Sequence, residues 1–228
     1  MKEVESLLSN RMLMVAGIVK PCDVIFDIGT DHCYLPIYLI QKKICNKAVA
    51  TDIRKGPIKI AKKNICIFEM EENIEAFVSE GINHVDTDAD IVISGMGADV
   101  IISILNNDLN IAKSASQIVI QCQSRTERLR AFFWDNGFEI TDEVLTAEKN
   151  KVYNAFNARY IGKIQKYTKI DTIASKLLVK NQNPMLSDYI ASYIQKLDDM
   201  ISGLDMGKKD YQNELELKRQ LEALHENI

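Results

Sequence analysis

The sequence predicts an α/β protein whose open, mainly parallel sheet is followed by a helical tail. Two observations predict this class. Apolar, strand-like runs alternate with helical patterns from about residue 20 to residue 136, and the chain beyond residue 163 shows no strand pattern. With 46% hydrophobic and 26% charged residues among 228, the composition is that of a globular protein large enough to bury a full core.

The individual elements follow from the spacing of the apolar residues. A leading helix is predicted between about Leu7 and Val19. Parallel strands are predicted at Val24–Ile28, Ala48–Asp52, Glu75–Ser79, Ile91–Ser94 and Ile118–Gln121. Helices are predicted at Tyr34–Lys43, Pro57–Ile67, Asp99–Leu105 and Thr126–Asn136. Two extended runs, Phe138–Thr146 and Val152–Tyr160, predict a β-hairpin that completes a seven-stranded sheet.

The tail from about Lys163 onward is predicted to be helical, so the expected domains are residues 1–162 and 163–228. Apolar residues recur at steps of three and four from Leu186 to Leu204 and again from Leu217 to Ile228. These two seams, joined near residues 203–207, predict an antiparallel, coiled-coil-like helical hairpin. The hairpin is either a core-packing or dimerising appendage, or an arm that grasps a substrate.

A run of lysines opens this tail. Five lysines accompany a single acid, Asp171, between residues 161 and 182; they are Lys163, Lys166, Lys169, Lys176 and Lys180. Such a run is either the solvated face of a helix or a patch that binds a polyanion. The net charge of −4 gives the whole chain no bulk attraction to nucleic acid, so the uneven distribution of charge is the relevant feature.

The stretch Asp27–Pro36 (DIGTDHCYLP) reads as a strand that turns through Gly29 into a helix, where doubly wound folds bind nucleotides. Only one glycine of the dinucleotide motif GxGxxG is present. Asp27 and Asp31 place carboxylates beside the gap, and carboxylates repel a pyrophosphate. The motif therefore favours S-adenosylmethionine, which carries a sulfonium and an ammonium and no phosphate.

Three further strand ends extend this predicted cofactor site. Asp52, about 20 residues beyond the turn, can accept hydrogen bonds from both hydroxyls of a ribose, although a surface acid is the simpler alternative. Glu80, before Gly81, is placed to accept a hydrogen bond from an adenine amine. The fourth strand runs into Ser94-Gly95-Met96-Gly97, where the reacting atoms should meet unless this is merely a glycine-rich turn.

The acceptor of the methyl group is predicted from the ends of the fourth and fifth strands. Enzymes that methylate exocyclic amines commonly carry Asn/Asp-Pro-Pro-aromatic after the fourth strand, and this chain does not. An aromatic ring nitrogen needs no such motif, because its lone pair is exposed and alignment with the methyl group suffices. Gln121 and Gln123 offer amides that can contact a base edge, with Arg125, Arg128 and Arg130 behind them unless these arginines are simply solvated.

Taken together, DIGTDHCYLP, the acid followed by Gly56-Pro57, the Ser94–Gly97 turn and the Leu129-Arg130 helix resemble the TrmK family. These are bacterial tRNA (adenine-N1)-methyltransferases that modify position 22. The resemblance extends from Leu8-Ser9-Asn10-Arg11 through the hairpin to a similar helical C-terminus. It implies a Rossmann-like, seven-stranded class I methyltransferase fold that uses S-adenosylmethionine, with a helical tail that helps to hold tRNA.

The residues and the resemblance together give a set of expected contacts. S-adenosylmethionine is expected to contact Asp27, Ile28, Gly29, Thr30, Asp31, His32, Asp52, Ile53, Glu80, Gly81, Gly95, Met96 and Gly97. The tRNA substrate is expected to contact Gln121, Gln123, Arg125, Lys163, Lys166 and Lys169. The family tends to show Gln-Pro-Asn where this chain has Gln-Cys-Gln at residues 121–123, which is its main departure near the substrate.

These observations predict transfer of a methyl group from S-adenosylmethionine to N1 of a tRNA adenine by in-line displacement. Asp31 is the expected catalytic residue, because the methylated ring is cationic and a nearby carboxylate can stabilise the developing charge. No essential general base is expected, since no proton must leave before attack. Two alternatives stay open: methylation of a protein or small molecule, and a non-catalytic RNA-binding scaffold.

Features of the whole chain complete the expectation. The N-terminus has no apolar segment of signal-peptide length, and no run of about 18 apolar residues occurs, so a cytoplasmic protein without membrane contact is expected. Five widely spaced cysteines without a CxxC pair indicate neither a disulfide framework nor a zinc site, and no metal is expected. A monomer is expected, with dimerisation through the tail as the alternative.

Overall fold

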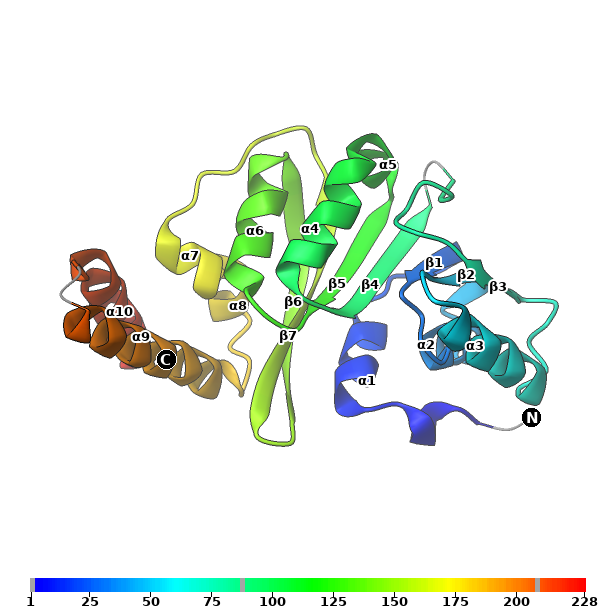
Figure 1. Ribbon diagram of the computed structural model, residues 1–228, viewed down its shortest axis with the longest axis horizontal. Coiled ribbons are helices and arrows are strands. Elements are labelled where there is room, and N and C mark those ends of the chain that lie inside the picture. Colours follow the sequence, from blue (N-terminus) through cyan, green and yellow to red (C-terminus); the bar gives the residue numbers. More distant parts are fainter. Residues whose placement is uncertain (1–2, 87–88, 208–209) are drawn as a thin grey trace.

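The computed structural model describes residues 3–86, 89–207 and 210–228, and these residues form a seven-stranded sheet (Figure 1). The strands are β1 Cys22–Ile28, β2 Cys45–Asp52, β3 Ile74–Val78, β4 Asp90–Met96, β5 Gln117–Cys122, β6 Phe138–Glu148 and β7 Lys151–Tyr160. They lie in the order β3-β2-β1-β4-β5-β7-β6. Among the strands in the described residues, only β7 runs antiparallel to its neighbours, and the other adjacent strands pair in parallel. The predicted sheet and its closing hairpin are confirmed.

Helices cover both faces of the sheet. The helices before the closing hairpin are α1 Asn10–Gly17, α2 Tyr34–Gln41, α3 Lys55–Ile67, α4 Ala98–Asn107, α5 Leu109–Ser114 and α6 Thr126–Asp135, and a short 3₁₀ helix covers Glu5–Leu7. The first three α-helices pack on one face and the next three on the other (Figure 1). Side chains along β4 alternate between these layers, because successive residues of a strand point to opposite faces. Val92 faces α1 to α3, and Ile91 and Ile93 face α4 to α6.

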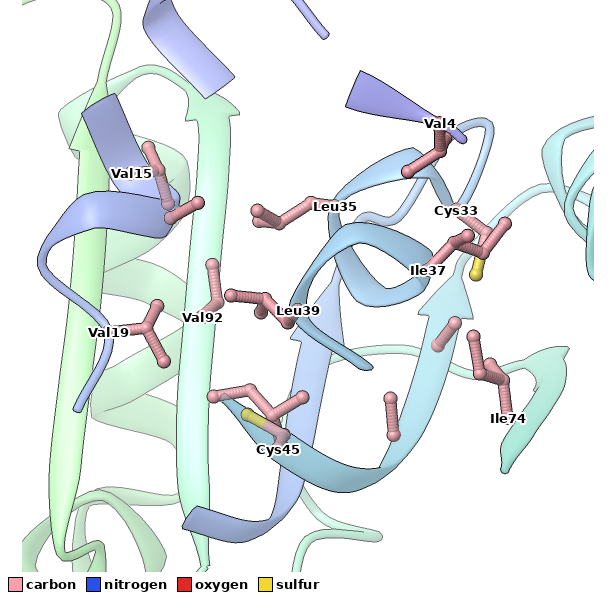
Figure 2. Close-up of a cluster of buried hydrophobic side chains, with 14 of the residues drawn as sticks. Val4, Val15, Val19, Cys33, Leu35, Ile37, Leu39, Cys45, Ile74 and Val92 are labelled. Atoms are coloured by element: carbon pink, nitrogen blue, oxygen red, sulfur yellow. The ribbon is translucent and has the colours of Figure 1, made fainter. Parts of the chain in front are cut away.

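The layer formed by α1 and α2 fixes the strands that carry the predicted site. Figure 2 shows Val15 of α1 and Leu35 and Leu39 of α2 packed around Val92 of β4. Leu35, Ile37 and Leu39 are at most 2% exposed. Burial of such side chains stabilises the fold by about 1.5–3 kcal/mol each. The turn that precedes α2 is therefore held between two well-packed elements.

The described residues of the tail form four helices after the connection 161–168: α7 Lys169–Ile173, α8 Lys176–Lys180, α9 Leu186–Met206 and α10 Gln212–His225. The connection is not helical, so the predicted helical tail begins six residues later than Lys163. The antiparallel hairpin of α9 and α10 is confirmed and projects from the sheet on the side away from α2 and α3 (Figure 1). Leu186 and Ile190 of α9 pack with Leu145 of β6 in a third core cluster, whereas Met200 of the predicted seam is 51% exposed.

A buried polar cluster fastens the tail to the sheet. Arg130 of α6 and Glu143 of β6 have fully buried side chains and form an ion pair, with Arg130 Nε donating to Glu143 Oε1 at 2.8 Å. The other oxygen of Glu143 accepts from the hydroxyl of Ser175, and Asn154 of β7 donates to Oε1 at 2.9 Å. Arg130 also donates to the hydroxyl of Tyr189 in α9 at 3.3 Å. These five residues are called the joint, and Arg130 is thus structural, not solvated.

No helix in residues 3–86, 89–207 or 210–228 is both long enough and apolar enough to cross a membrane.

Candidate active site

Two adjoining cavities open at the carboxyl ends of β1, β2, β4 and β5. Their volumes are about 470 Å³ and about 320 Å³. Both are lined by Gly29, Asp52, Arg54 and Met96, so they adjoin one another, and together they are called the cofactor cleft below. Open α/β sheets bind ligands at this edge.

The turn after β1 brings bare backbone to the cleft. Gly29 has a φ of +80°, and a Cβ atom added there would lie 2.2 Å from Cε of Met96. Its amide and that of Thr30 both donate to the carbonyl of Thr51 at 2.8 Å, which ties the turn to the end of β2. The positive φ favours glycine, and a side chain there would also have to displace the end of the Met96 side chain.

Three predicted carboxylates lie at different depths around this turn. Asp27 is 4% exposed and lines neither cavity, so it lies beneath the cleft instead of in its wall. Burial raises the pKa of Asp27 to about 6, and the nearby charge of Asp52 adds to the effect. Asp52 is 6% exposed, lines both cavities and accepts a hydrogen bond from the amide of Arg54 at 2.8 Å. Asp31 lines the smaller cavity and its side chain is 61% exposed.

The larger cavity contains most of the residues predicted for the nucleoside. Ile28, Gly29, Asp52, Ile53, Glu80, Gly81 and Met96 line it. Sequence reasoning missed Asp99, Ser103 and Asn107 of α4, which also line it. Their spacing of four residues, directly after the Gly95–Gly97 turn, places them on one helix face and is the signal that could have identified them. Gly97, which precedes α4, lines neither cavity.

The smaller cavity has a wall formed by distant parts of the chain. Thr30, Asp31, Ser94 and Gly95 line it beside Gln121 and Gln123. Arg11, Met12 and Val15 of α1 complete this wall, and no motif in the sequence had placed them there. Because α1 packs across the sheet, it contributes side chains to a site at least 14 residues away in sequence.

The two glutamines predicted to contact the substrate have different surroundings. Gln121 is fully buried, accepts from the amide of Gly95 at 3.2 Å and donates to the carbonyl of Cys122 at 2.8 Å. Both ends of its amide are therefore occupied by backbone, so Gln121 shapes the turn after β4. Gln123 is exposed, and its Nε2 lies 3.7 Å from the position of a Cβ on Gly95. Gln123 is thus the glutamine available to a base.

The predicted basic residues do not converge on the cleft. Arg125 pairs with Asp99 at 2.9 Å, beside the larger cavity. Lys163, Lys166 and Lys169 line neither cavity of the cleft. The connection that carries Lys163 and Lys166 passes the C-terminal end of α6, at the opposite edge of the sheet, where the amide of Gln165 donates to the carbonyl of Trp134 (Figure 1). A direct contact between these lysines and a base in the cleft is therefore not supported.

The described side chains around the cofactor cleft are not arranged for nucleophilic catalysis or for binding a metal ion. His32 lines neither cavity, and its Nδ1 lies 2.7 Å from a carboxylate oxygen of Asp31. Burial raises the pKa of the Cys122 thiol, which keeps it protonated and poorly nucleophilic. Within the described parts of the chain, no group of three or more His, Cys, Asp or Glu side chains is arranged to hold a metal ion.

Comparisons with known proteins agree with this geometry. A family model described as a methyltransferase domain matches residues 8–156. The chain is 26% identical, over 98% of both chains, to the tRNA (adenine(22)-N(1))-methyltransferase of Bacillus subtilis. It is 25% identical to TrmK of M. capricolum, solved with S-adenosyl-homocysteine, with a TM-score of 0.79 and coverage of 96% and 97%. A Streptococcus agalactiae protein of the NADB-Rossmann superfamily gives a TM-score of 0.84 at 25% identity, with coverage of 94% and 96%.

Proposed function

Because this chain belongs to the methyltransferase domain family, and because its resemblance to the TrmK family is confirmed over nearly its whole length, we propose that it methylates N1 of an adenine in tRNA. The methyl donor is S-adenosylmethionine, and position 22 is the expected target, as the name of the B. subtilis relative indicates. The observation that carries the proposal is a glycine turn beside buried and exposed carboxylates, joined to an acceptor cavity without an amine-binding motif.

The residues of the cleft fit S-adenosylmethionine. Asp52 ends β2 as a buried carboxylate in a cavity of about 470 Å³, which suits a ribose diol. Gly29 presents bare backbone to the cleft at a φ of +80°, which other residues rarely adopt. Asp31 offers an exposed carboxylate at the side of the cleft that is suited to a cationic group. When bound, S-adenosylmethionine supplies an electrophilic methyl group to the acceptor nitrogen.

The chain's own residues then have distinct roles. Gln121 holds the turn at Gly95 through its buried amide, and Gln123 is the proposed contact to the adenine edge. Asp31 is the proposed catalytic residue, because its carboxylate can stabilise positive charge that develops on the ring. His32 holds this carboxylate by the 2.7 Å contact at Nδ1 and is a positioning residue. No side chain is required to remove a proton from N1.

The proposed arrangement of the chain extends to the tail. We place the catalytic unit at residues 1–162 and assign tRNA contacts outside the cleft to residues 163–228, including Lys163, Lys166 and Lys169. The joint supports a tail held firmly against the catalytic unit. We further propose that the protein acts as a monomer in the cytoplasm, where its tRNA substrate is found.

The experiment that tests the function is methyl transfer to RNA. The protein is incubated with labelled S-adenosylmethionine and unmodified bacterial tRNA, and the digested product is examined by chromatography and mass spectrometry. N1-methyladenosine is the expected product, and a transcript with adenine 22 replaced should remain unlabelled. Label in RNA on a different atom would contradict the proposed acceptor.

Two outcomes distinguish the alternative functions. Cofactor binding by calorimetry without label in any tRNA would favour a protein or small-molecule acceptor. No detectable cofactor binding would favour a non-catalytic RNA-binding scaffold. Salt titration adds a further criterion, because binding to tRNA should weaken steeply as counterions compete for the phosphates.

A further inference from the structure

Beside the cofactor cleft lies a larger cavity of about 710 Å³, called the side groove below. It lies between the loop 122–127 after β5, the tip of the β6–β7 hairpin and α9. Gln123 lines both the side groove and the smaller cavity of the cleft. An RNA chain that delivers a base to the cleft at Gln123 therefore brings a neighbouring nucleotide to the groove.

The side groove is basic although the whole chain has a net charge of −4. The charged residues of its lining are Arg125, Lys149, Lys151, Lys196, Glu127 and Asp188. Glu127 accepts a hydrogen bond from the hydroxyl of Tyr193 at 3.0 Å and keeps its charge. Arg125 pairs with Asp99 outside the groove, so the three lysines supply the excess of positive charge. Lys149 and Lys151 lie at the tip of the hairpin and are exposed. A groove with an excess of cations concentrates phosphate groups.

Tyr153 adds an aromatic surface next to these lysines. Its ring lines the side groove from β7, and the guanidinium of Arg11 lies 5.2 Å from the ring centroid. Arg11 itself lines the smaller cavity of the cleft, so the pair stands between the two spaces. Bases of single-stranded RNA stack on tyrosine rings and on arginine guanidinium planes. A ring and flanking cations together match the base and the phosphates of one nucleotide.

The floor of the side groove is held by the joint. Asn154 and Tyr189 line the groove and bond to Glu143 and Arg130, respectively, in the buried cluster. A surface held in this way loses little conformational entropy when a ligand binds. The groove is therefore prepared for its ligand before the RNA arrives.

We propose that the side groove binds a nucleotide adjacent to the target adenine, with its base on Tyr153 and its phosphates at Lys149 and Lys151. This inference rests on the proposed function, because it assumes that the adenine enters the cleft from a tRNA. The target base must leave its stack to reach the cleft, and contacts with the adjacent nucleotide offset part of that cost.

Variants of the groove and a matched control test this proposal. The variants are Tyr153→Ala and the pair Lys149→Glu/Lys151→Glu, and the control is Lys62→Glu/Lys63→Glu on the exposed surface of α3, which changes the charge equally. Both groove variants should weaken tRNA binding, measured by fluorescence anisotropy, by at least about tenfold, while the control changes it by less than about threefold. Binding of S-adenosylmethionine by calorimetry should stay unchanged in all three and reports correct folding.

Combining the protein variant Tyr153→Ala with altered RNA, as in a double-mutant cycle, shows which nucleotide contacts Tyr153. An abasic nucleotide is placed on the 5′ or the 3′ side of the target adenine. One of these substrates should bind the unaltered protein about as weakly as normal tRNA binds Tyr153→Ala, with no further loss when the two changes are combined. Additive losses for both abasic substrates, or groove variants that bind like the control, would overturn the proposal. Anisotropy requires no methyl transfer, so failure of the proposed function would show separately, as tRNA that remains unmethylated by the unaltered protein.

Discussion

The joint and the cofactor cleft differ in how far their charged side chains are buried. In the joint, the side chains of Arg130 and Glu143 are fully buried and paired with each other. At the cleft, the side chain of Asp31 is 61% exposed. Buried charges need fixed partners because desolvation is costly, whereas exposed charges remain available to a ligand. Changes in the joint should therefore appear in the free energy of unfolding, and changes in the cleft should appear in activity.

The largest effect is expected from Arg130→Ala. It leaves the carboxylate of Glu143 buried without its cation, which should lower the free energy of unfolding by about 3–5 kcal/mol. Urea unfolding measures the loss. The matched control is Arg128→Ala, two residues earlier in α6, whose 55% exposed side chain pairs with Asp99 and should contribute less than about 1 kcal/mol. Equal losses for the two variants would remove the distinction between the regions.

Asp31→Ala should show the opposite signature. Loss of the carboxylate should reduce kcat by about 100- to 1000-fold, because charge developing on the adenine is no longer stabilised. Asp31 has a φ of 51°, so alanine also introduces backbone strain there. Asp31→Asn is the cleaner control, since asparagine tolerates this conformation and lacks only the charge. Near-normal turnover in Asp31→Asn would contradict the catalytic assignment.

Asp27 shares a property with each region, because it lies beneath the cleft and is buried like the residues of the joint. Its pKa is raised by burial from 3.8 to about 6, so the folded state holds the proton more tightly than the unfolded state. Its contribution to stability is greatest below about pH 4 and is lost as the pH rises towards 6. The free energy of unfolding of Asp27→Asn minus that of the unaltered protein should therefore be about 2–3 kcal/mol more favourable to the variant at pH 7 than at pH 4.

The test is to measure the free energy of unfolding of the unaltered protein and of Asp27→Asn at several pH values between 4 and 7. The difference between them should grow across this interval and then level off above the raised pKa. A constant difference would show that Asp27 titrates normally in the folded protein. Calorimetry on the same variant would report whether the buried carboxylate also supports cofactor binding.

The smallest effect is expected from His32→Gln. The histidine holds Asp31 at 2.7 Å but lines neither cavity, so its loss should lower kcat by less than about tenfold. Because no general base is required, the pH profile of kcat should keep its shape in the variant. A steep decrease of activity that follows a histidine titration and disappears in His32→Gln would assign a proton-transfer role instead.

Local sequence patterns were sufficient to predict site residues that a single strand, turn or helix positions. The turn at Asp27–Pro36 was predicted because a strand, a glycine and a helix follow directly in the chain. The placement of Asp52 at the carboxyl edge followed equally from the end of its strand. The polar residues of α4 that line the cleft were not predicted, because the strand-end pattern ends at the glycine turn before them. Their regular spacing was nevertheless present in the sequence.

The sequence by itself determined the alternation of strands and helices, the edge of the sheet that binds the cofactor and the acidic character of that edge. Only the tertiary structure decided that Gln121 bonds to backbone, that Arg11 reaches the cleft, and that Arg130 is buried against Glu143. It also placed the connection 161–168, which carries Lys163, beside the C-terminal end of α6, at the edge opposite the cleft (Figure 1). The physical reason is that side-chain pairing across distant elements depends on packing of the whole chain, whereas strand ends and turns depend on neighbouring residues.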